Sequence, residues 1–330
     1  MEDYCIRYAN YSDIPSIMNF IDEYWRKNHI LSRDRGLFEW QYVDDGKLNM
    51  ILGEDENGGV AAILGFIPYD KVDTKDFSLA LWKAKPGTAF LGIKLLLFLL
   101  KNEPHRNMFC NGINVKTSAG IYHRLGIATG ELSQWYRLAK GVKYRIACVE
   151  DDTVPEVTAE DGYSFEEMQR EHVISEEDYE QISNPNVTPY KSYAYFVKRY
   201  INHPTYEYLV YKVIHSEVVK AIIVFRIQDC NDSHALRLID YIGDYSVLYR
   251  LTSLIDELVK SLRTEYVDIY EKGLDDSELS ASGWIKVGTN NNIIPNYFSP
   301  YTKCNVPISI STSDENIVLF KGDGDQDRPN

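Results

Sequence analysis

Residues 79–127 of the chain read LALWKAKPGTAFLGIKLLLFLLKNEPHRNMFCNGINVKTSAGIYHRLGI. This stretch predicts an apolar strand, a turn containing Gly87, a strongly apolar helix, a second strand, and a short helix that carries Tyr122 and ends at Leu125-Gly126. A strand that turns directly into a helix presents free backbone N–H groups at the helix N-terminus, where they can bind an anion such as a diphosphate. The stretch therefore predicts the core of an α/β domain with a ligand site at its turn.

The residues before this core predict a strand, two helices and a hairpin. Residues 4–9 form the first strand, and apolar residues recur at helical spacing after Ser12, which can cap that helix. A short second helix is expected over 36–43. Strands 48–54 and 59–67 are joined by Asn57-Gly58, a strong hairpin signal because both residues tolerate positive φ. After the core, residues 132–149 predict one or two closing strands.

The second half of the chain repeats the element order of the first. Residues 38–42 (FEWQY) match residues 196–200 (FVKRY) at an offset of 158. The predicted helix end at 125–127 (LGI) has a counterpart at 282–284 (SGW) at an offset of 157. Between the halves, residues 150–162 are acidic and lack periodicity. We therefore expect two tandem domains, 1–149 and 163–330, joined by the acidic linker 150–162. Residues 288–330 fall outside the repeat and form a C-terminal extension.

The composition is that of a globular protein, with 44% hydrophobic and 25% charged residues and a formal net charge of −14. This charge repels nucleic-acid phosphate and anionic membrane surfaces, so neither is expected as a bulk partner. The N-terminus lacks a signal-peptide apolar region, and the apolar run 91–100 is too short to span a membrane. Five scattered cysteines without CxxC spacing indicate reduced thiols, so a cytoplasmic protein is expected. A monomer and a homodimer both remain open.

Four features of residues 4–140 carry a family resemblance: the opening IRYANYSDIPSIM, the Asn-Gly hairpin, the strand–turn–helix of 79–100, and AGIYHRLGI at 119–127. Together they resemble the GCN5-related N-acetyltransferases, usually shortened to GNAT. The last feature is the most specific, since Ala119, Tyr122 and Leu125-Gly126 follow the family pattern. The resemblance implies that Tyr122 protonates a departing thiolate. It also implies that Asn114 contacts the pantetheine arm or diphosphate of acetyl-CoA or another acyl-CoA.

The diphosphate loop departs from the family pattern, which has Arg or Gln, two residues, Gly, one residue, and then Gly or Ala. Alignment on Gly92 puts Phe90 at the first Gly position and Gly87 at the Arg or Gln position. Lysines can replace the missing positive charge, and residues 86–88 can turn the chain. The expected cofactor-binding residues are Leu81, Trp82, Lys83, Lys85, Gly87, Thr88, Gly92 and Asn114, with Lys94 as a further cation. Altered coenzyme A geometry, a different activated donor and the absence of any cofactor stay open as alternatives.

The resemblance implies an acyl-CoA-dependent N-acyltransferase that acts on a small-molecule amine. An amino sugar or nucleotide-linked amino sugar is expected, because aromatic and carboxylate side chains suit a polyhydroxylated acceptor. Backbone N–H groups at 81–83 are expected to stabilise the oxyanion. The general base is open; Glu39 and Asp240 are candidates because their segments are expected near the cleft. The alternatives are a Fem-like aminoacyl transferase, disfavoured by the net charge, and a non-catalytic GNAT-like binding module.

The C-terminal extension ends in an acidic run with Asp323, Asp325 and Asp327 at alternating positions. It lacks the sixth-position Gly and closing Glu of an EF-hand, so a solvated acidic tail is expected. The alternative is that Arg328 and these aspartates fold back to hold a sugar or an amine. The turn at 242–246 has one Gly and an added carboxylate, so no coenzyme A is expected in the second half. The seven histidines show no metal-ligand spacing, and no metal is expected.

Overall fold

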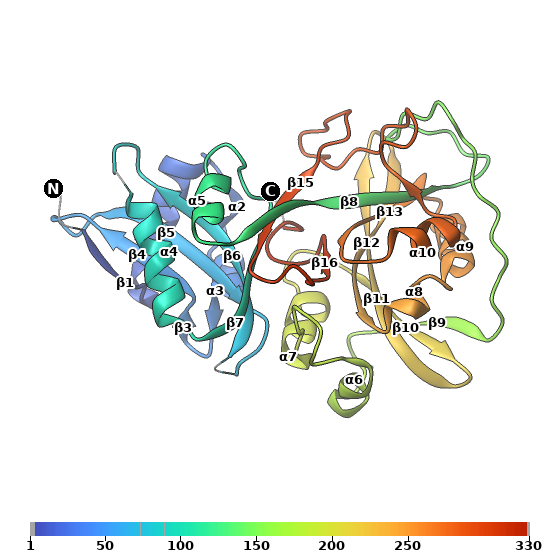
Figure 1. Ribbon diagram of the computed structural model, residues 1–330, viewed down its shortest axis with the longest axis horizontal. Helices are drawn as coiled ribbons and strands as arrows, with labels where there is room; N and C mark the ends of the chain where they lie inside the picture. The colour runs from blue at the N-terminus through green and yellow to red at the C-terminus, as the bar shows by residue number, and fades with distance from the viewer. Residues whose placement is uncertain (1–3, 73, 89, 329–330) are drawn as a thin grey trace.

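The computed structural model describes residues 4–72, 74–88 and 90–328. These residues form a mixed 14-stranded sheet that runs through the whole molecule, and a separate two-stranded hairpin. The strands follow the order β1-β4-β5-β6-β7-β15-β8-β13-β12-β11-β10-β9, with β14 beside β8 and β16 beside β13. Helices flank the sheet in both halves (Figure 1). No helix in the described part of the chain is both long and apolar enough to cross a bilayer.

The first half runs from β1 to α5 and places helices on both faces of its strands. Leu79 of β6 packs with α4 and α5 on one face, whereas Ala80 packs with α1 to α3 on the other. The elements are β1 (Cys5–Tyr8), η1 (Tyr11–Asp13), α1 (Ile14–Phe20), η2 (Ile21–Trp25), α2 (Ile30–Arg33), α3 (Arg35–Tyr42), β2 (Val43–Asp44), β3 (Lys47–Leu48), β4 (Met50–Glu54), β5 (Val60–Pro68), β6 (Lys75–Ala84), α4 (Leu91–Asn102), β7 (His105–Asn111) and α5 (Ala119–Arg124).

The second half runs from β9 to β14, and its elements follow a similar order, although its described residues have no counterpart of the β2–β3 hairpin. Its core lies on both sheet faces: Ile239 packs with α6 and α7, and Leu238 packs with α8 and α9. The elements are β9 (Tyr163–Glu167), α6 (Glu176–Ile182), α7 (Tyr193–Phe196), η3 (Val197–Ile201), β10 (Leu209–His215), β11 (Val218–Cys230), β12 (Ser233–Gly243), α8 (Tyr245–Leu248), α9 (Thr252–Ser261), β13 (Tyr266–Lys272), α10 (Asp276–Ala281) and β14 (Ile285–Lys286).

Two strands tie the halves together. The strand β8 (Ala128–Leu138) pairs with β15 (Ile308–Thr312) through residues 128–132 and with β13 through residues 133–138. The strand β15 also pairs with β7, so it completes the first half although it lies near the end of the sequence. Figure 1 shows β8 as a green strand that crosses from one half to the other. The halves therefore share one continuous sheet.

The predicted division at 150–162 stays a prediction. These residues contain no helix or strand and are mostly exposed, as expected of a connector. The strand β15, however, comes from the predicted second domain and is built into the first half. Each half consequently depends on the other for its complete sheet.

The expectation of a solvated acidic tail is wrong. Asp323, Asp325 and Asp327 are exposed by only 0%, 8% and 1%. We call residues 319–328 the C-terminal segment; it begins with β16 (Leu319–Phe320) and lies between the two halves (Figure 1). Its carboxylates are buried against basic groups of the second half, including Lys191 and Arg226, which compensate their charge.

Candidate functional site

The first-half strands β6 and β7 pair in parallel for only a short distance. Their ladder ends at Ser78 and Phe109, although β6 continues to Ala84 beside β5. We call the region beyond this point the first-half split. Within it, Leu81 and Trp82 of β6 stand opposite one residue of β5, and Leu81 has a φ of 51°. This β-bulge puts Ala80 and Leu81 on the same face of the sheet.

A bulge leaves its extra residue without a ladder partner, and bulges are common beside active sites. Positive φ is costly for a branched residue such as leucine, so the surrounding packing must hold it there. The bulge thus lies within the 81–83 stretch from which oxyanion-stabilising N–H groups are expected.

Tyr122 lies in α5 on the α4 face, and only 1% of it is exposed. Its hydroxyl lies near Cys110 and Ser311, and its ring centroid is 5.9 Å from that of Trp82 in the split. Burial raises the pKa of Tyr122, with a further contribution from Cys110. The phenol is therefore protonated at neutral pH and can act as a hydrogen-bond or proton donor.

The turn before α4 has an unusual conformation at Phe90. This residue is the N-cap of α4, has a φ of 61° and is 72% exposed. The backbone thus takes the left-handed conformation that Gly prefers, at the position where the family has Gly, while the ring lies in solvent. Gly92 is needed for a different reason: a Cβ there would lie 3.1 Å from the Trp82 indole nitrogen. Ala89, within the predicted diphosphate loop, lies outside the described residues.

Most of the other predicted cofactor residues lie in or beside this turn. Lys85 lies 4.0 Å from Asp55 and 5.2 Å from the ring centroid of Tyr24. Thr88 donates from its hydroxyl to the Lys85 carbonyl at 2.7 Å, which fixes the turn around exposed Gly87. Lys83 is half-buried and Lys94 is exposed. Asn114 is exposed, and its Oδ1 accepts from the Lys116 N–H at 3.1 Å.

The second half has an equivalent split that the chain itself fills. The ladder between β12 and β13 ends at Leu238 and Ile269, and a bulge follows at Ile239, 158 residues after Leu81. In this split, residues 319 and 320 of the C-terminal segment pair with β13. On the other side, the Gly322 N–H donates to the Ile239 carbonyl at 2.8 Å. The C-terminal segment therefore bridges β12 and β13.

A buried ion cluster anchors this segment. Lys191 forms ion pairs with Asp240 and, at 3.0 Å, with Asp323. Tyr200 donates to Asp240 at 2.6 Å, and Tyr69 donates to Asp323 at 3.1 Å. Burial raises the pKa of Asp323 to about 6, and Lys191 opposes that shift. The cluster joins the first half, the second half and the C-terminal segment.

The two acid candidates for a general base lie outside the cavities described below. Asp240 is fully buried and bonded within the Lys191 cluster. Glu39 accepts from the Arg35 Nε at 2.5 Å, one helical turn away on α3. Tyr11 and Arg35 lower the pKa of Glu39. Neither carboxylate lines either cavity.

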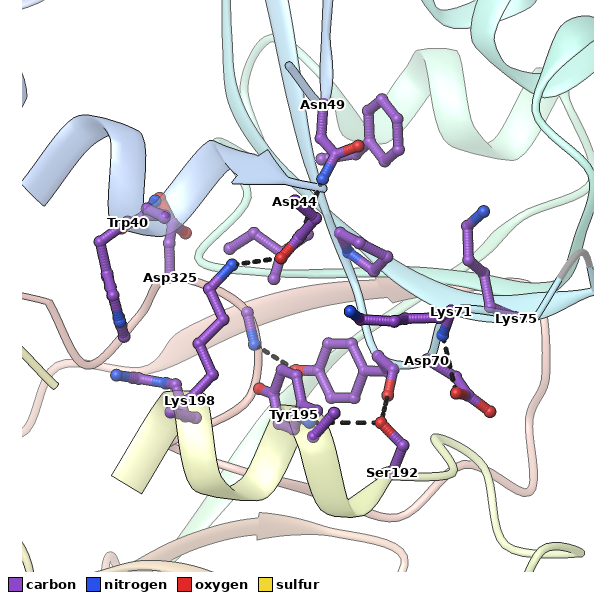
Figure 2. A pocket seen from close by; sticks show the side chains of 18 of the residues that line it. Trp40, Asp44, Asn49, Asp70, Lys71, Lys75, Ser192, Tyr195, Lys198 and Asp325 are labelled. Carbon is purple, nitrogen blue, oxygen red and sulfur yellow. Dashed lines mark hydrogen bonds and ion pairs between the residues drawn. The ribbon is translucent and has the colours of Figure 1, made fainter. Parts of the chain in front are cut away.

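The first cavity, the α3 cavity, has a volume of about 430 Å³ and lies between α3 with the β2–β3 hairpin and the α7–η3 segment. Lys198 reaches across it to Asp44, with Nζ 2.6 Å from Oδ1 (Figure 2). The Trp40 and His203 rings are 4.3 Å apart at their centroids. Burial, followed by Arg199, lowers the pKa of His203 to about 3. The wall thus combines aromatic rings with an ion pair from opposite halves.

The second cavity, the β7 cavity, has a volume of about 550 Å³ and lies beyond the carboxyl end of β7. Gly112 and Arg26 line it from the first half, and Arg226 lines it from β11. Asp325, Asp327 and Arg328 line both cavities, so the C-terminal segment lies between the two. Arg328, an expected substrate residue, lies 5.7 Å from the Trp25 ring centroid. Burial raises the pKa of Cys110 beside Tyr122, and the charge of Arg328 opposes that shift.

The structure thus brings Leu81, Trp82, Gly92 and Tyr122 together around the first-half split. Sequence reasoning missed Lys191 and Arg226, which flank the C-terminal segment, and Lys321 within it, because their partners lie far along the chain. One signal was present: Gly322 and Gly324 alternate with the aspartates. A Cβ at either glycine would meet neighbouring atoms at 2.6 Å, and such glycines mark close backbone approach.

No protein-family model and no curated protein matches the sequence. Solved structures do match. A GCN5-related N-acetyltransferase from Anabaena variabilis ATCC 29413 has a TM-score of 0.60 and 11% identity, over 94% of this chain and 72% of that chain. A conserved protein from Enterococcus faecalis V583, described as a probable N-acyltransferase, has a TM-score of 0.56 and 9% identity over the same shares. The chain therefore has a GNAT fold, and the predicted α/β fold class is confirmed.

Proposed function

We propose that this protein is an acyl-CoA-dependent N-acyltransferase with one donor site, located at the first-half split. The observation that carries the proposal is the bulge at Leu81, which lies where β6 leaves β7 and beside the buried phenol of Tyr122. Thioester aminolysis requires backbone donors for the carbonyl oxygen and a protonated acid for the departing thiolate. The second-half split has the equivalent bulge, but the C-terminal segment fills it.

Acyl-coenzyme A would supply the thioester whose carbonyl carbon the amine attacks, with the C–S bond breaking as the C–N bond forms. In this proposal, N–H groups at 81–83 stabilise negative charge on the carbonyl oxygen. Tyr122 donates its proton to the departing thiolate, and water takes the proton that the amine loses. The N-terminus of α4 and the lysines beside it favour the diphosphate electrostatically.

The acceptor amine is proposed to bind in the cleft that the C-terminal segment divides. An amino sugar or nucleotide-linked amino sugar remains the proposed class, because the α3 cavity combines aromatic rings such as Trp40 and Tyr195 with carboxylates such as Asp44 and Asp70. Rings stack on sugar faces, while carboxylates accept hydrogen bonds from hydroxyl and ammonium groups.

Calorimetric titration with acetyl-CoA tests the donor site. We expect one molecule bound per chain, since the C-terminal segment fills the second-half split. Tyr122→Phe should leave the dissociation constant unchanged and lower the acyl-transfer rate by about 10²-fold or more, the usual effect of losing a general acid. Tyr270→Phe is the matched control, because its buried hydroxyl has no partner within the described residues.

Absence of acetyl-CoA binding at millimolar concentration would overturn the proposal and leave a GNAT-like binding module. Two molecules bound per chain would contradict the filled second split. If Tyr122→Phe and Tyr270→Phe reacted at the same rate, Tyr122 would have no part in proton transfer. Activity with aminoacyl-tRNA instead of acyl-CoA would support the Fem-like alternative.

A further inference from the structure

The β7 cavity has an excess of positive charge, which is unusual in a chain with a net charge of −14. Four cationic side chains line it: Arg26, Arg226, Lys321 and Arg328. Two carboxylates line it as well, and each is already paired, Asp327 with Arg226 and Asp325 with Arg328. Among the described residues, no ion pair joins Arg26 or Lys321 to a carboxylate. The cavity therefore has two cations beyond its carboxylates.

Two of these groups are largely removed from water, whereas Arg26 is exposed at the mouth of the cavity. Arg226 and Lys321 are exposed by only 7% and 5%. Burial lowers the pKa of Lys321 well below its ordinary value, and Arg237 lowers it further. Asp268 and Asp327 oppose this shift only in part, and an anion in the cavity would further favour the charged form of Lys321.

An unpartnered donor lies in the same wall. Asn296 is 3% exposed, and its Oδ1 accepts from Arg237 at 3.0 Å and from Lys321. These two bonds fix the orientation of the amide. Its Nδ2 is left without a partner within the described residues, although Asn296 lines the cavity. A buried donor of this kind costs free energy unless a ligand or water accepts from it.

The cavity adjoins the proposed donor site. Gly112 and Ile113, which directly follow β7, line it at the strand edge where the first-half split opens. Arg26 follows η2 on the α1–α3 face, opposite the face that carries α4, α5 and Tyr122. Arg328 connects the two regions, because it lines the cavity and its charge acts on Cys110 beside Tyr122. A ligand in the cavity would thus approach the split from the α1–α3 face, opposite the face that carries Tyr122.

We infer that the β7 cavity is an anion subsite that takes the phosphate or carboxylate of the acceptor, so that the substrate is an amine that also carries an anionic group. Arg26, Lys321 and the Asn296 amide contact the anion. Arg226 and Arg328 stay paired with their aspartates and keep the wall positive. Identification of the anion as part of the acceptor rests on the proposed acyl transfer; anion binding by the cavity does not. A volume of about 550 Å³ accommodates a small molecule.

The binding test uses inorganic phosphate and calorimetry in the absence of any acyl-CoA. The wild-type chain should bind phosphate saturably. Arg26→Gln should weaken binding about tenfold, the usual effect of losing one hydrogen bond to a charged group. Arg33→Gln is the matched control, since Arg33 is exposed, lies in the same half and lines neither cavity. Asn296→Asp should abolish binding, because it puts a negative charge in the wall beside Arg237 and Lys321, which can stabilise it.

Three amines of similar length then separate the sources of the anion: ethanolamine, phosphoethanolamine and β-alanine. With acetyl-CoA as donor, the inference expects phosphoethanolamine or β-alanine to have a kcat/KM at least about tenfold above that of ethanolamine. The preferred anion identifies phosphate or carboxylate. Arg26→Gln should remove this preference while leaving acetyl-CoA affinity unchanged.

Lack of phosphate binding, or equal weakening in Arg26→Gln and Arg33→Gln, would overturn the anion subsite. Equal turnover of all three amines would show that the subsite does not select the acceptor. If phosphate binding behaves as expected but acetyl-CoA does not bind, the acyltransferase proposal fails and the anion subsite stands. The two proposals can therefore fail separately.

Discussion

The insertion of the C-terminal segment into the second-half split can be tested at Gly322. Replacement by alanine adds a Cβ that would lie 2.6 Å from the Tyr200 hydroxyl oxygen and 2.8 Å from both the carbonyl oxygen and Cγ2 of Ile239. That carbonyl accepts the N–H of Gly322 itself at 2.8 Å, so it cannot move away without weakening the bond. Tyr200 is equally restrained, by its 2.6 Å hydrogen bond to Asp240.

The expected loss of stability follows from these contacts. Overpacking of this kind costs about 1–3 kcal/mol, and the strained hydrogen bond contributes about 1 kcal/mol more. Alanine lowers the conformational entropy of the unfolded chain relative to glycine, which stabilises the folded protein by about 0.4–1 kcal/mol. The net expectation for Gly322→Ala is therefore a decrease of about 1–3.5 kcal/mol in the free energy of unfolding.

Urea denaturation measures this decrease as a lower midpoint with an unchanged slope. Gly36→Ala is the control, because an added Cβ on α3 would meet its nearest atom, an Asp34 carboxylate oxygen, at 3.4 Å. That variant should match the wild-type chain or be slightly more stable, since alanine favours helix. If Gly322→Ala were as stable as Gly36→Ala to within about 0.5 kcal/mol, the segment would not occupy the split as described.

Two further predictions concern buried charges. Burial raises the pKa of Glu271 from 4.5 to about 7. Between those pH values the unfolded chain ionises before the folded one, so folding stability falls as pH rises, by up to about 3 kcal/mol. Both Glu271 oxygens accept hydrogen bonds, from the Trp135 indole and the Leu274 N–H, and glutamine can accept only one of them. Glu271→Gln should therefore lower the melting temperature at pH 4.5 and be distinctly less destabilising at pH 8, unlike Glu278→Gln on the surface; equal shifts at both pH values would contradict this. Lys191→Met should cost about 3–5 kcal/mol, because it leaves Asp240 and Asp323 buried without their cation. Lys198→Met removes a half-exposed pair and should cost less than about 1 kcal/mol, and the reasoning fails if the two lysine variants unfold at the same urea concentration.

Much of the first half follows from local sequence signals. The periodicity of residues 79–127 predicts β6, α4, β7 and α5 in their observed order, and Asn57-Gly58 predicts the turn between β4 and β5. These elements depend on alternation, helical spacing and turn residues, all of which act over a few positions. The offset of 158 residues between the aromatic segments 38–42 and 196–200 equals the separation of the bulges at Leu81 and Ile239.

Local sequence signals predicted only part of the candidate site. Tyr122 and the 81–83 stretch follow from the order of elements, and the structure places them around one split. The left-handed conformation of Phe90 has no local signal, because phenylalanine rarely adopts it and the packing around α4 must impose it. The groups that line the β7 cavity come from both halves and from the C-terminal segment, so no single stretch of sequence indicates it.

By itself, then, the sequence indicated the order of elements in the first half and the tyrosine beside the split. Tertiary structure alone decided that β8 serves both halves, that β15 returns to the first half, and that the C-terminal segment fills the second split. Strand pairing across such separations depends on which edges remain free after folding, which alternation within a strand does not specify. An acidic run by itself likewise predicts solvent exposure, because the cations that pair with it are not apparent nearby in the sequence. Here Lys191 and Arg226 lie about a hundred residues or more before Asp323 and Asp327, which they neutralise.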